Sequence, residues 1–322
     1  MHYKWGIVGS GWIAHDMADA LDQEKIGVYG ISSGHYESAL KFAKEYQIEH
    51  VYSSYQEMFK DENIDIVYIA TPHNTHYEIM KNALLSGKHV FCEKAITLNS
   101  KQLNECVQIA KEKSLVIMDG VTLFHMPLFK MLKDRIQSKE LGPVKMIQVN
   151  FGSFKEYDVK NRFFNPNLAG GALLDIGVYA ISFVRYFMQS SPNEILTTMF
   201  PFETGVDETS GVLLKNADQE MATVSLTMRA KQPKRGLIAC ENGYIEIYNF
   251  PRANQATITY TKDGHVENVT CGKSELALNY EILDMEEYVS CLNHENNLQY
   301  IQDVMDVLTK VRLQWGMVYP NE

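Results

Sequence analysis

Apolar residues in the first 120 positions form short runs, separated by longer stretches in which they recur every three or four residues. Short runs are typical of strands in a parallel sheet, and the longer spacing is typical of the helices that cover it. The runs predict strands over residues 3–8, 26–32, 64–70, 89–92 and 115–118. The helices predicted between them have apolar faces at Ile13, Ala14, Met17, Ala18 and Leu21, at Ala39, Leu40, Phe42 and Ala43, at Ile79, Ala83 and Leu84, and at Leu103, Val107 and Ala110. This alternation predicts a doubly wound α/β domain over residues 1–120.

The pattern changes after Gly120. Residues 127–137 and 173–187 have helical spacing, and residues 144–152 resemble a strand. Residues 195–269 are rich in short strands separated by turn signals, which indicates a largely antiparallel sheet. Two further helical patterns, 280–291 and 298–315, follow. We therefore predict an α+β domain with a large, mostly antiparallel open sheet over residues 121–322.

The first strand leads directly into Gly9-Ser10-Gly11-Trp12-Ile13-Ala14. Gly9 permits a tight turn, Gly11 lets the backbone approach a pyrophosphate, and Ala14 lets the helix pack closely on the strand. The first amides of the helix then face the phosphates. The alternative is a tight turn without a ligand, but the required strand precedes this motif and the required helix follows it. We therefore predict a Rossmann-type NAD(P) site that includes residues 9–13.

The end of the second strand governs the choice between NAD and NADP. A site that prefers NAD usually offers a carboxylate to the adenosine ribose, about 20 residues beyond the glycines. Residues 26–36 contain no Asp or Glu, so a 2′-phosphate would meet no repulsion there. We expect Ser32, Ser33 and His35 to belong to the cofactor site, where Ser33 and His35 could contact the phosphate. The segment also lacks an Arg, and a turn that accepts either cofactor is the alternative. We predict that NADP is preferred over NAD.

Composition narrows the possible partners. The net charge of -10 argues against nucleic acid, and no uninterrupted apolar run approaches the ~18 residues of a membrane span. The start of the chain shows no secretion signal. Its five cysteines are scattered and form no CxxC pair, which favours reduced thiols. We therefore expect a cytoplasmic protein that binds a small molecule, with no nucleic-acid or membrane partner and no metal.

Three further segments carry a family resemblance. They are Ala70-Thr71-Pro72-His73-Asn74-Thr75-His76, Gly87-Lys88-His89-Val90-Phe91-Cys92-Glu93-Lys94-Ala95 and Gly170-Gly171-Ala172-Leu173-Leu174-Asp175-Ile176-Gly177-Val178-Tyr179. With the glycine turn, their order and spacing resemble the Gfo/Idh/MocA family (glucose–fructose oxidoreductase, inositol dehydrogenase, rhizopine catabolism) over the whole chain. Because its last motif position, 179, is a tyrosine, the chain resembles the branch of the family that contains glucose–fructose oxidoreductase and dimeric dihydrodiol dehydrogenase.

The resemblance implies an oxidoreductase whose active-site lysine is Lys94 and whose helix motif supplies Asp175 and Tyr179. Tyrosine ordinarily titrates near ~10, and a neighbouring ammonium would favour the tyrosinate. Tyr179 would then exchange the hydroxyl proton of the substrate, assisted by Lys94, while Asp175 orients Lys94 or accepts from a substrate hydroxyl. The family's cofactor-side loops map onto Thr71, Pro72, His73, His76, Glu93 and Lys94.

One position departs from the family pattern, because Ala95 stands where the family has proline after its lysine. Proline fixes its own φ and allows a cis bond before it, and alanine does neither. We therefore expect a trans peptide between Lys94 and Ala95, which leaves the aim of Lys94 open.

Candidates for the substrate side are chosen by position: His125, Asn161, Arg162 and Phe163. A surface loop explains these positions equally well. A metal site made of His73, His76 and His125 is the less favoured alternative, because no acidic or cysteine ligand accompanies them at metal-like spacing.

The leading interpretation is an NAD(P)-dependent dehydrogenase or reductase acting on a sugar, polyol, dihydrodiol or related hydroxy or carbonyl compound. A non-catalytic NAD(P)-binding sensor on the same fold is the alternative, since fold alone does not separate the two. A methyltransferase is disfavoured, because the helix motif has no role there. The resemblance also implies a homodimer or higher homo-oligomer formed through the open face of the C-terminal sheet.

Overall fold

The structure is a computed structural model that describes residues 2–293, 296–320 and 322. The chain divides into two compact units. The first comprises the residues up to Gly120 together with Leu278–Gln299, and the second comprises Val121–Ala277 with Tyr300–Glu322.

The first unit contains a six-stranded parallel sheet with the order β3-β2-β1-β4-β5-β6. This is the strand order of a dinucleotide-binding Rossmann domain, in which ligands lie at the carboxyl ends of the strands where the order reverses, here between β1 and β4. The predicted α/β class is confirmed. The strands are β1 (Trp5–Val8), β2 (Gly30–Ser32), β3 (His50–Tyr52), β4 (Ile66–Ile69), β5 (His89–Cys92) and β6 (Ile117–Asp119).

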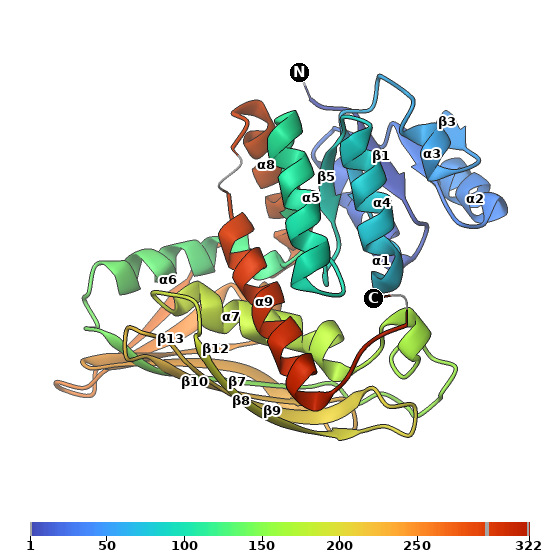
Figure 1. Cartoon of the computed structure of the whole chain (residues 1–322). Helices are drawn as coiled ribbons and strands as arrows, with labels where there is room; N and C mark the ends of the chain where they lie inside the picture. The colour runs from blue at the N-terminus through green and yellow to red at the C-terminus, as the bar shows by residue number, and fades with distance from the viewer. Residues whose placement is uncertain (1, 294–295, 321) are drawn as a thin grey trace. The chain divides into compact units, whose positions relative to one another are not determined.

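Helices flank this sheet. Residues of α1, α2 and α8 share one hydrophobic core with the strands, while α4 and α5 pack side by side and lie in front of the sheet in Figure 1. The helices are α1 (Trp12–Gln23), α2 (Tyr36–Tyr46), α3 (Tyr55–Met58), α4 (His73–Leu85), α5 (Ser100–Lys113) and α8 (Ala277–Ser290).

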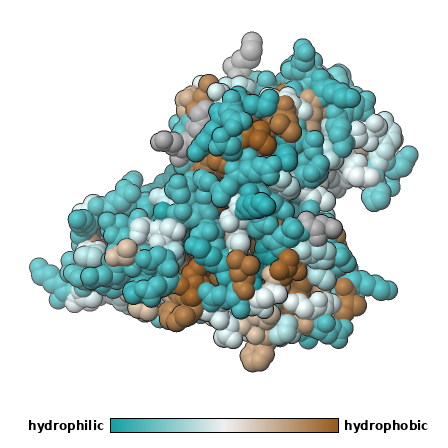
Figure 2. Space-filling view, viewed as in Figure 1, coloured by the Kyte–Doolittle hydropathy of each residue, from teal (hydrophilic) through white to brown (hydrophobic). Residues whose placement is uncertain are grey.

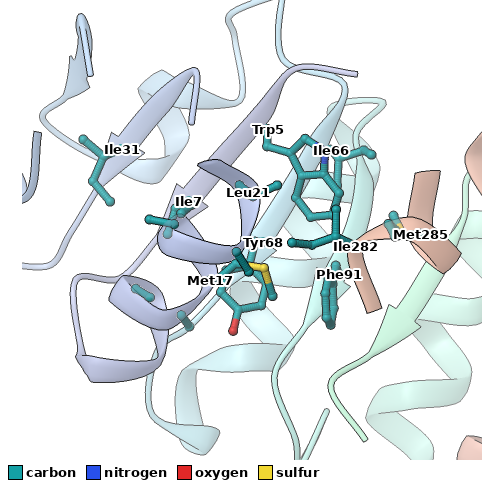
Figure 3. Packing of buried hydrophobic residues seen from close by; sticks show 14 of the residues in the cluster. Trp5, Ile7, Met17, Leu21, Ile31, Ile66, Tyr68, Phe91, Ile282 and Met285 are labelled. Atoms are coloured by element: carbon teal, nitrogen blue, oxygen red, sulfur yellow. The ribbon is translucent and has the colours of Figure 1, made fainter. Parts of the chain in front are cut away.

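Helix α8 corrects the predicted division of the chain, which placed all of residues 121–322 in the second domain. Its apolar face, with Ile282 and Met285, reaches the same core as Trp5, Tyr68 and Phe91 (Figure 3). Periodicity alone identified this helix but not the core that it joins. The apolar stripe of an amphipathic helix indicates that the helix packs against a core, but it does not indicate which sheet contributes that core.

Two differences in the first sheet have local causes. The predicted strand 26–32 is shorter, because the amides of Ile26 and Gly27 both donate to the carbonyl oxygen of Leu21 and so belong to the turn that ends α1. Strand β3 was not predicted. Its three residues are all half-buried at the sheet edge, and so short a segment shows no periodicity.

The second unit contains an eight-stranded sheet with the order β14-β13-β12-β11-β7-β10-β9-β8. One neighbouring pair, β7 with β10, is parallel, and the other pairs are antiparallel, so the predicted mostly antiparallel sheet is confirmed. The strands are β7 (Val144–Gly152), β8 (Glu194–Pro201), β9 (Asp207–Lys215), β10 (Met221–Thr227), β11 (Gln232–Cys240), β12 (Gly243–Tyr248), β13 (Gln255–Tyr260) and β14 (Val266–Thr270).

The helices α6 (Pro127–Gln137), α7 (Val178–Phe187) and α9 (Leu298–Trp315) lie on one face of this sheet (Figure 1). A π-helical segment, Leu173–Gly177, leads directly into α7. Short 3-10 turns complete the unit at Thr122–Phe124, Pro166–Leu168, Phe250–Arg252 and Ser274–Leu276.

Among the described residues, one helical stretch, Pro166–Phe187, is long and apolar enough to cross a membrane. However, 83% of its most apolar window is buried inside the protein, as in the core helix of many globular domains. The face shown in Figure 2 is largely hydrophilic, with hydrophobic residues in small groups. The stretch is therefore weak support for a membrane span.

Candidate active site

The turn after β1 requires glycine at position 9. Gly9 has a φ of 111°, and a Cβ there would lie 2.4 Å from the carbonyl oxygen of Ala70. Its amide donates to the carbonyl oxygen of Ser32 at 2.8 Å. The close approach of β1, β2 and β4 at this point thus depends on a residue without a side chain.

Gly11 is different, because its φ is −80° and a Cβ there would have no protein atom within 4 Å. Gly11 directly precedes α1. The first residue of this helix, Trp12, is 66% exposed. The first amides of a helix have no partner inside the helix, and no side chain in the described part of the chain caps this one. Open space beside uncapped amides fits the pyrophosphate of a dinucleotide.

Ser33 joins the glycine turn to the end of β2. The hydroxyl oxygens of Ser10 and Ser33 lie 3.0 Å apart, and Ser32 is buried. His35 is exposed and directly precedes α2. The structure thus brings Ser33 beside the turn, at the edge of the sheet where the adenosine ribose of a dinucleotide would lie.

His76 fixes the loop after β4. Its Nδ1 lies 2.9 Å from the carbonyl oxygen of Ala95, and its Nε2 lies 2.7 Å from that of Thr71. The ring is fully buried, and burial lowers the pKa of His76. The ring of His73 stands edge-on to it, with centroids 5.7 Å apart. Both nitrogens of His76 therefore face the backbone, as expected of a histidine that orders a loop.

Glu93 holds the segment that carries Lys94. Its carboxylate accepts from the Tyr68 hydroxyl at 2.6 Å and from the Lys94 amide at 3.3 Å. A Cβ on Gly120 would lie 3.1 Å from the same carboxyl group, so a side chain there would crowd it. Burial, followed by the negative charge of Glu93, raises the pKa of Tyr68, which therefore remains a proton donor to Glu93. Tyr68 and Gly120 thus support the predicted cofactor residue Glu93.

The peptide bond between Lys94 and Ala95 is cis, so the expectation of a trans bond is wrong. That expectation considered only the local preference of alanine. Here the surrounding structure determines the conformation, because Ala95 is completely buried and its carbonyl oxygen is held by the His76 ring.

In the second unit, Asp175 and Tyr179 lie four residues apart where the π-helical segment joins α7. The predicted helix 173–187 has the right extent, but its first five residues are π-helical rather than α-helical. Asp175 is buried, and its Oδ1 lies 3.5 Å from Nη2 of Arg162. The Arg162 guanidinium also stands 4.7 Å from the ring centroid of Phe163. The structure therefore brings three of the predicted residues together.

The remaining candidates of this unit lie in different surroundings. Tyr179 is half-buried, and its ring centroid is 6.4 Å from that of Phe151 on β7. Asn161 is exposed, and its side-chain oxygen accepts from the Phe163 amide at 3.3 Å. His125 is only 1% exposed. Asn161 thus shapes the loop that holds Arg162 and Phe163.

Comparison with known proteins decides the family. The model described as "Oxidoreductase family, NAD-binding Rossmann fold" matches residues 3–121, and the model of the "GFO/IDH/MocA C-terminal domain" matches residues 129–246. The trans-1,2-dihydrobenzene-1,2-diol dehydrogenase of Xenopus laevis is 32% identical over 267 residues, which are 82% of this chain and 80% of that protein. The chain belongs to the Gfo/Idh/MocA family.

Two more comparisons extend over nearly the whole chain. The scyllo-inositol 2-dehydrogenase (NADP(+)) of Bacillus subtilis is 28% identical over 336 residues, covering 99% of each protein. A 3-ketoreductase from Actinomadura kijaniata, solved with NADP and TDP-benzene, has a TM-score of 0.84 at 21% identity and covers 97% of this chain and 98% of that chain. This last likeness concerns the fold. As a member of the Gfo/Idh/MocA family, the protein is an NAD(P)-dependent oxidoreductase that acts on CH–OH groups.

Sequence reasoning missed the residues that hold the family's motifs in place. Tyr68 lies in an uninterrupted apolar strand, where it resembles any other core residue. Asp207 is the first residue of β9 and follows a turn, with no motif around it, yet it is completely buried. A buried acidic residue cannot be recognised from this strand, because β9 begins with the polar run Asp207-Glu208-Thr209-Ser210.

Proposed function

We propose that this Gfo/Idh/MocA protein transfers a hydride between NADP and a small sugar, polyol or dihydrodiol-like compound, with Tyr179 as the proton donor or acceptor. The observation that supports this most is the Arg162–Asp175 contact on the helix that carries Tyr179. It joins residues that the family resemblance marks as catalytic to a cationic loop suited to a hydroxylated substrate.

The roles follow from the chemistry of each side chain. In carbonyl reduction Tyr179 donates its phenolic proton to the developing alkoxide, and in alcohol oxidation its phenolate accepts that proton. The Lys94 ammonium favours the phenolate and binds the reacting oxygen. Asp175, whose carboxylate is oriented by Arg162, accepts a hydrogen bond from a neighbouring substrate hydroxyl. The nicotinamide cofactor supplies or receives the hydride when it is bound.

Substitution of Tyr179 tests this assignment. Turnover is followed by NADPH absorbance against a panel of sugars, inositols and diols, with Tyr179→Phe compared with Tyr248→Phe. Tyr248 is 56% exposed, so Tyr248→Phe should leave kcat and NADPH affinity unchanged. Loss of acid–base catalysis should lower kcat of Tyr179→Phe by about 10²-fold or more, with unchanged NADPH affinity. Wild-type turnover in Tyr179→Phe would remove Tyr179 from the proton step. Cofactor binding without turnover on any substrate would favour the sensor.

We also propose that NADP is preferred over NAD. Ser33 lies against the glycine turn, His35 is exposed, and residues 26–36 carry no carboxylate that would repel a 2′-phosphate. The dissociation constants of NADPH and NADH test this directly. A Ser33→Asp variant should weaken NADPH binding about tenfold and leave NADH binding nearly unchanged. Tighter NADH binding by the wild type would contradict the preference.

We propose further that the protein forms a homodimer or larger homo-oligomer in the cytoplasm through the sheet face opposite α7. On the edge strand β8, Leu196 and Phe200 are 67% and 76% exposed. Leu196 pairs with the half-buried Leu213 of β9, whereas the adjacent Ile195 pairs with the buried Leu214. Leu196 therefore lies on the uncovered face, as residues at a subunit interface would. Sedimentation as a monomer at micromolar concentration would contradict this proposal.

A further inference from the structure

The turn that precedes the Asp175–Tyr179 helix is held from three sides. Gly171 has a φ of 113°, and its amide donates to the carbonyl oxygen of Phe163 at 2.9 Å. The Tyr319 hydroxyl donates to the carbonyl oxygen of Gly170 at 2.6 Å. The third contact comes from Asp207, the first residue of β9, which follows the turn that ends β8.

Asp207 is completely buried and faces the first amides of the helix. Its Oδ2 accepts from the Leu173 amide at 2.7 Å. Its Oδ1 lies only 2.2 Å from the point where a Cβ on Gly171 would stand. The space that glycine leaves open is thus filled by a carboxylate from a strand 36 positions further along the chain (207 − 171). The amino end of this helix receives its capping group from another element of the second unit.

We propose that Asp207 is a positioning residue for proton transfer, whose carboxylate caps the helix and so sets the direction of Asp175 and Tyr179. The inference rests on the proposed role of Tyr179. The capped residue, Leu173, lies two positions before Asp175 and six before Tyr179, so a change at the cap displaces both side chains together. A displacement of about 1 Å in such a group costs up to 10²-fold in rate.

Because the cap is a buried carboxylate, its charge depends on pH, whereas a neutral cap would stay uncharged at every pH. An anion at the amino end of a helix is favoured by the helix dipole. Burial acts in the opposite direction and raises the pKa of Asp207 to about 7, against the lowering effect of its hydrogen bonds and of Arg312 on α9. Arg312 is itself paired with Glu322, and the phenol of Tyr319 also faces Asp207. The cap therefore loses its charge as pH falls below neutrality.

The decisive experiment compares Asp207→Asn with Asp263→Asn. Asparagine keeps the shape and one acceptor oxygen but removes the charge. Asp263 is the matched control, because its carboxylate also accepts from a backbone amide, that of His265 at 2.9 Å, but in an exposed turn. Readouts are kcat from pH 5.5 to 9 on the fastest substrate of the panel above, the NADPH dissociation constant, and hydrogen exchange of residues 172–179.

We expect Asp207→Asn to lower kcat about tenfold at pH 8, to remove the fall of kcat below pH 7, and to speed exchange of the Leu173 and Asp175 amides at least tenfold. NADPH affinity at pH 8 should stay at the wild-type value, and the melting temperature at pH 8 should not fall below that of the wild type. The proposal is overturned if exchange and the pH profile match those of Asp263→Asn, or if kcat falls only in step with a lower melting temperature. Tyr179→Phe is measured alongside: wild-type turnover in that variant defeats the proposed function, while the exchange data still decide whether Asp207 caps the helix.

Discussion

Two helices of this protein begin after glycines, and the two starts are built in opposite ways. At α1, the position of a Cβ on Gly11 is open and no side chain in the described ranges caps the helix. Before α7, the corresponding space at Gly171 is filled by the carboxylate of Asp207, which binds the Leu173 amide. The start of α1 has no side-chain cap, which suits the proposed cofactor, whereas the Leu173 amide at the other start is bound by a side chain of the protein.

The difference explains which glycines serve binding and which serve folding. A glycine beside open space keeps room for a partner that comes from outside, and its substitution should change affinity. A glycine beside a buried carboxylate keeps room for the protein itself, and its substitution should change stability. Three substitutions test this distinction, beginning with the largest expected effect.

Substitution of Gly171 by alanine should destabilise the second unit by about 3 kcal/mol. The new Cβ would stand 2.2 Å from Oδ1 of Asp207, and alanine is strained at a φ of 113°. Urea unfolding of Gly171→Ala measures the loss. Gly211→Ala is the control, because a Cβ on Gly211 would have no neighbour within 4 Å and its φ is not in the left-handed region. Equal stability of the two variants would show that the carboxylate does not need this space.

The pH dependence of stability should differ between wild type and Asp207→Asn. Because burial raises the pKa of Asp207 to about 7, the folded state keeps a proton that the unfolded chain releases near pH ~4. The stability that the protonated Asp207 contributes is thus fully present below pH ~4 and is lost as pH rises to about 7. Relative to the variant, the wild type should lose stability over this window, at up to about 1.4 kcal/mol per pH unit. Hydrogen exchange of the β9 and β10 amides at pH 5, 6, 7 and 8 measures the slope, and parallel curves would contradict it.

The same comparison shows how far the sequence predicts the molecule. The strand, glycine turn and helix of 5–23 are adjacent in the chain, so their residues predict both the element and its ligand class. The helix with Asp175 and Tyr179 could also be placed by its spacing. Its cap could not, because Asp207 reaches it from a distant strand. Likewise, α8 has a recognisable apolar stripe but joins the core of Trp5 and Phe91, which only the folded chain reveals.

The cis bond at Lys94–Ala95 teaches the same lesson at a single peptide. Alanine gives no local signal for it, and the contacts around Ala95 come from His76, which lies 19 positions earlier. Sequence motifs thus located the groups that are proposed to act, Lys94 among them. The residues that hold those groups, such as Tyr68 and His76, act through contacts that have no fixed spacing along the chain.

The smallest of the three effects is expected at Gly11. Alanine fits the φ of −80° at this position, and its Cβ would meet no protein atom within 4 Å. The free energy of unfolding of Gly11→Ala should therefore lie within about 0.5 kcal/mol of the wild-type value. Its methyl group would occupy the space predicted for the pyrophosphate, so NADPH binding should weaken about tenfold, or ~1.4 kcal/mol. Gly211→Ala again serves as the control, since its open space lies on β9 of the second unit. NADPH titration by fluorescence, together with urea unfolding, separates the two quantities. If Gly11→Ala lost stability but kept its affinity, both glycines would serve folding, and the contrast between the two helix starts would fail.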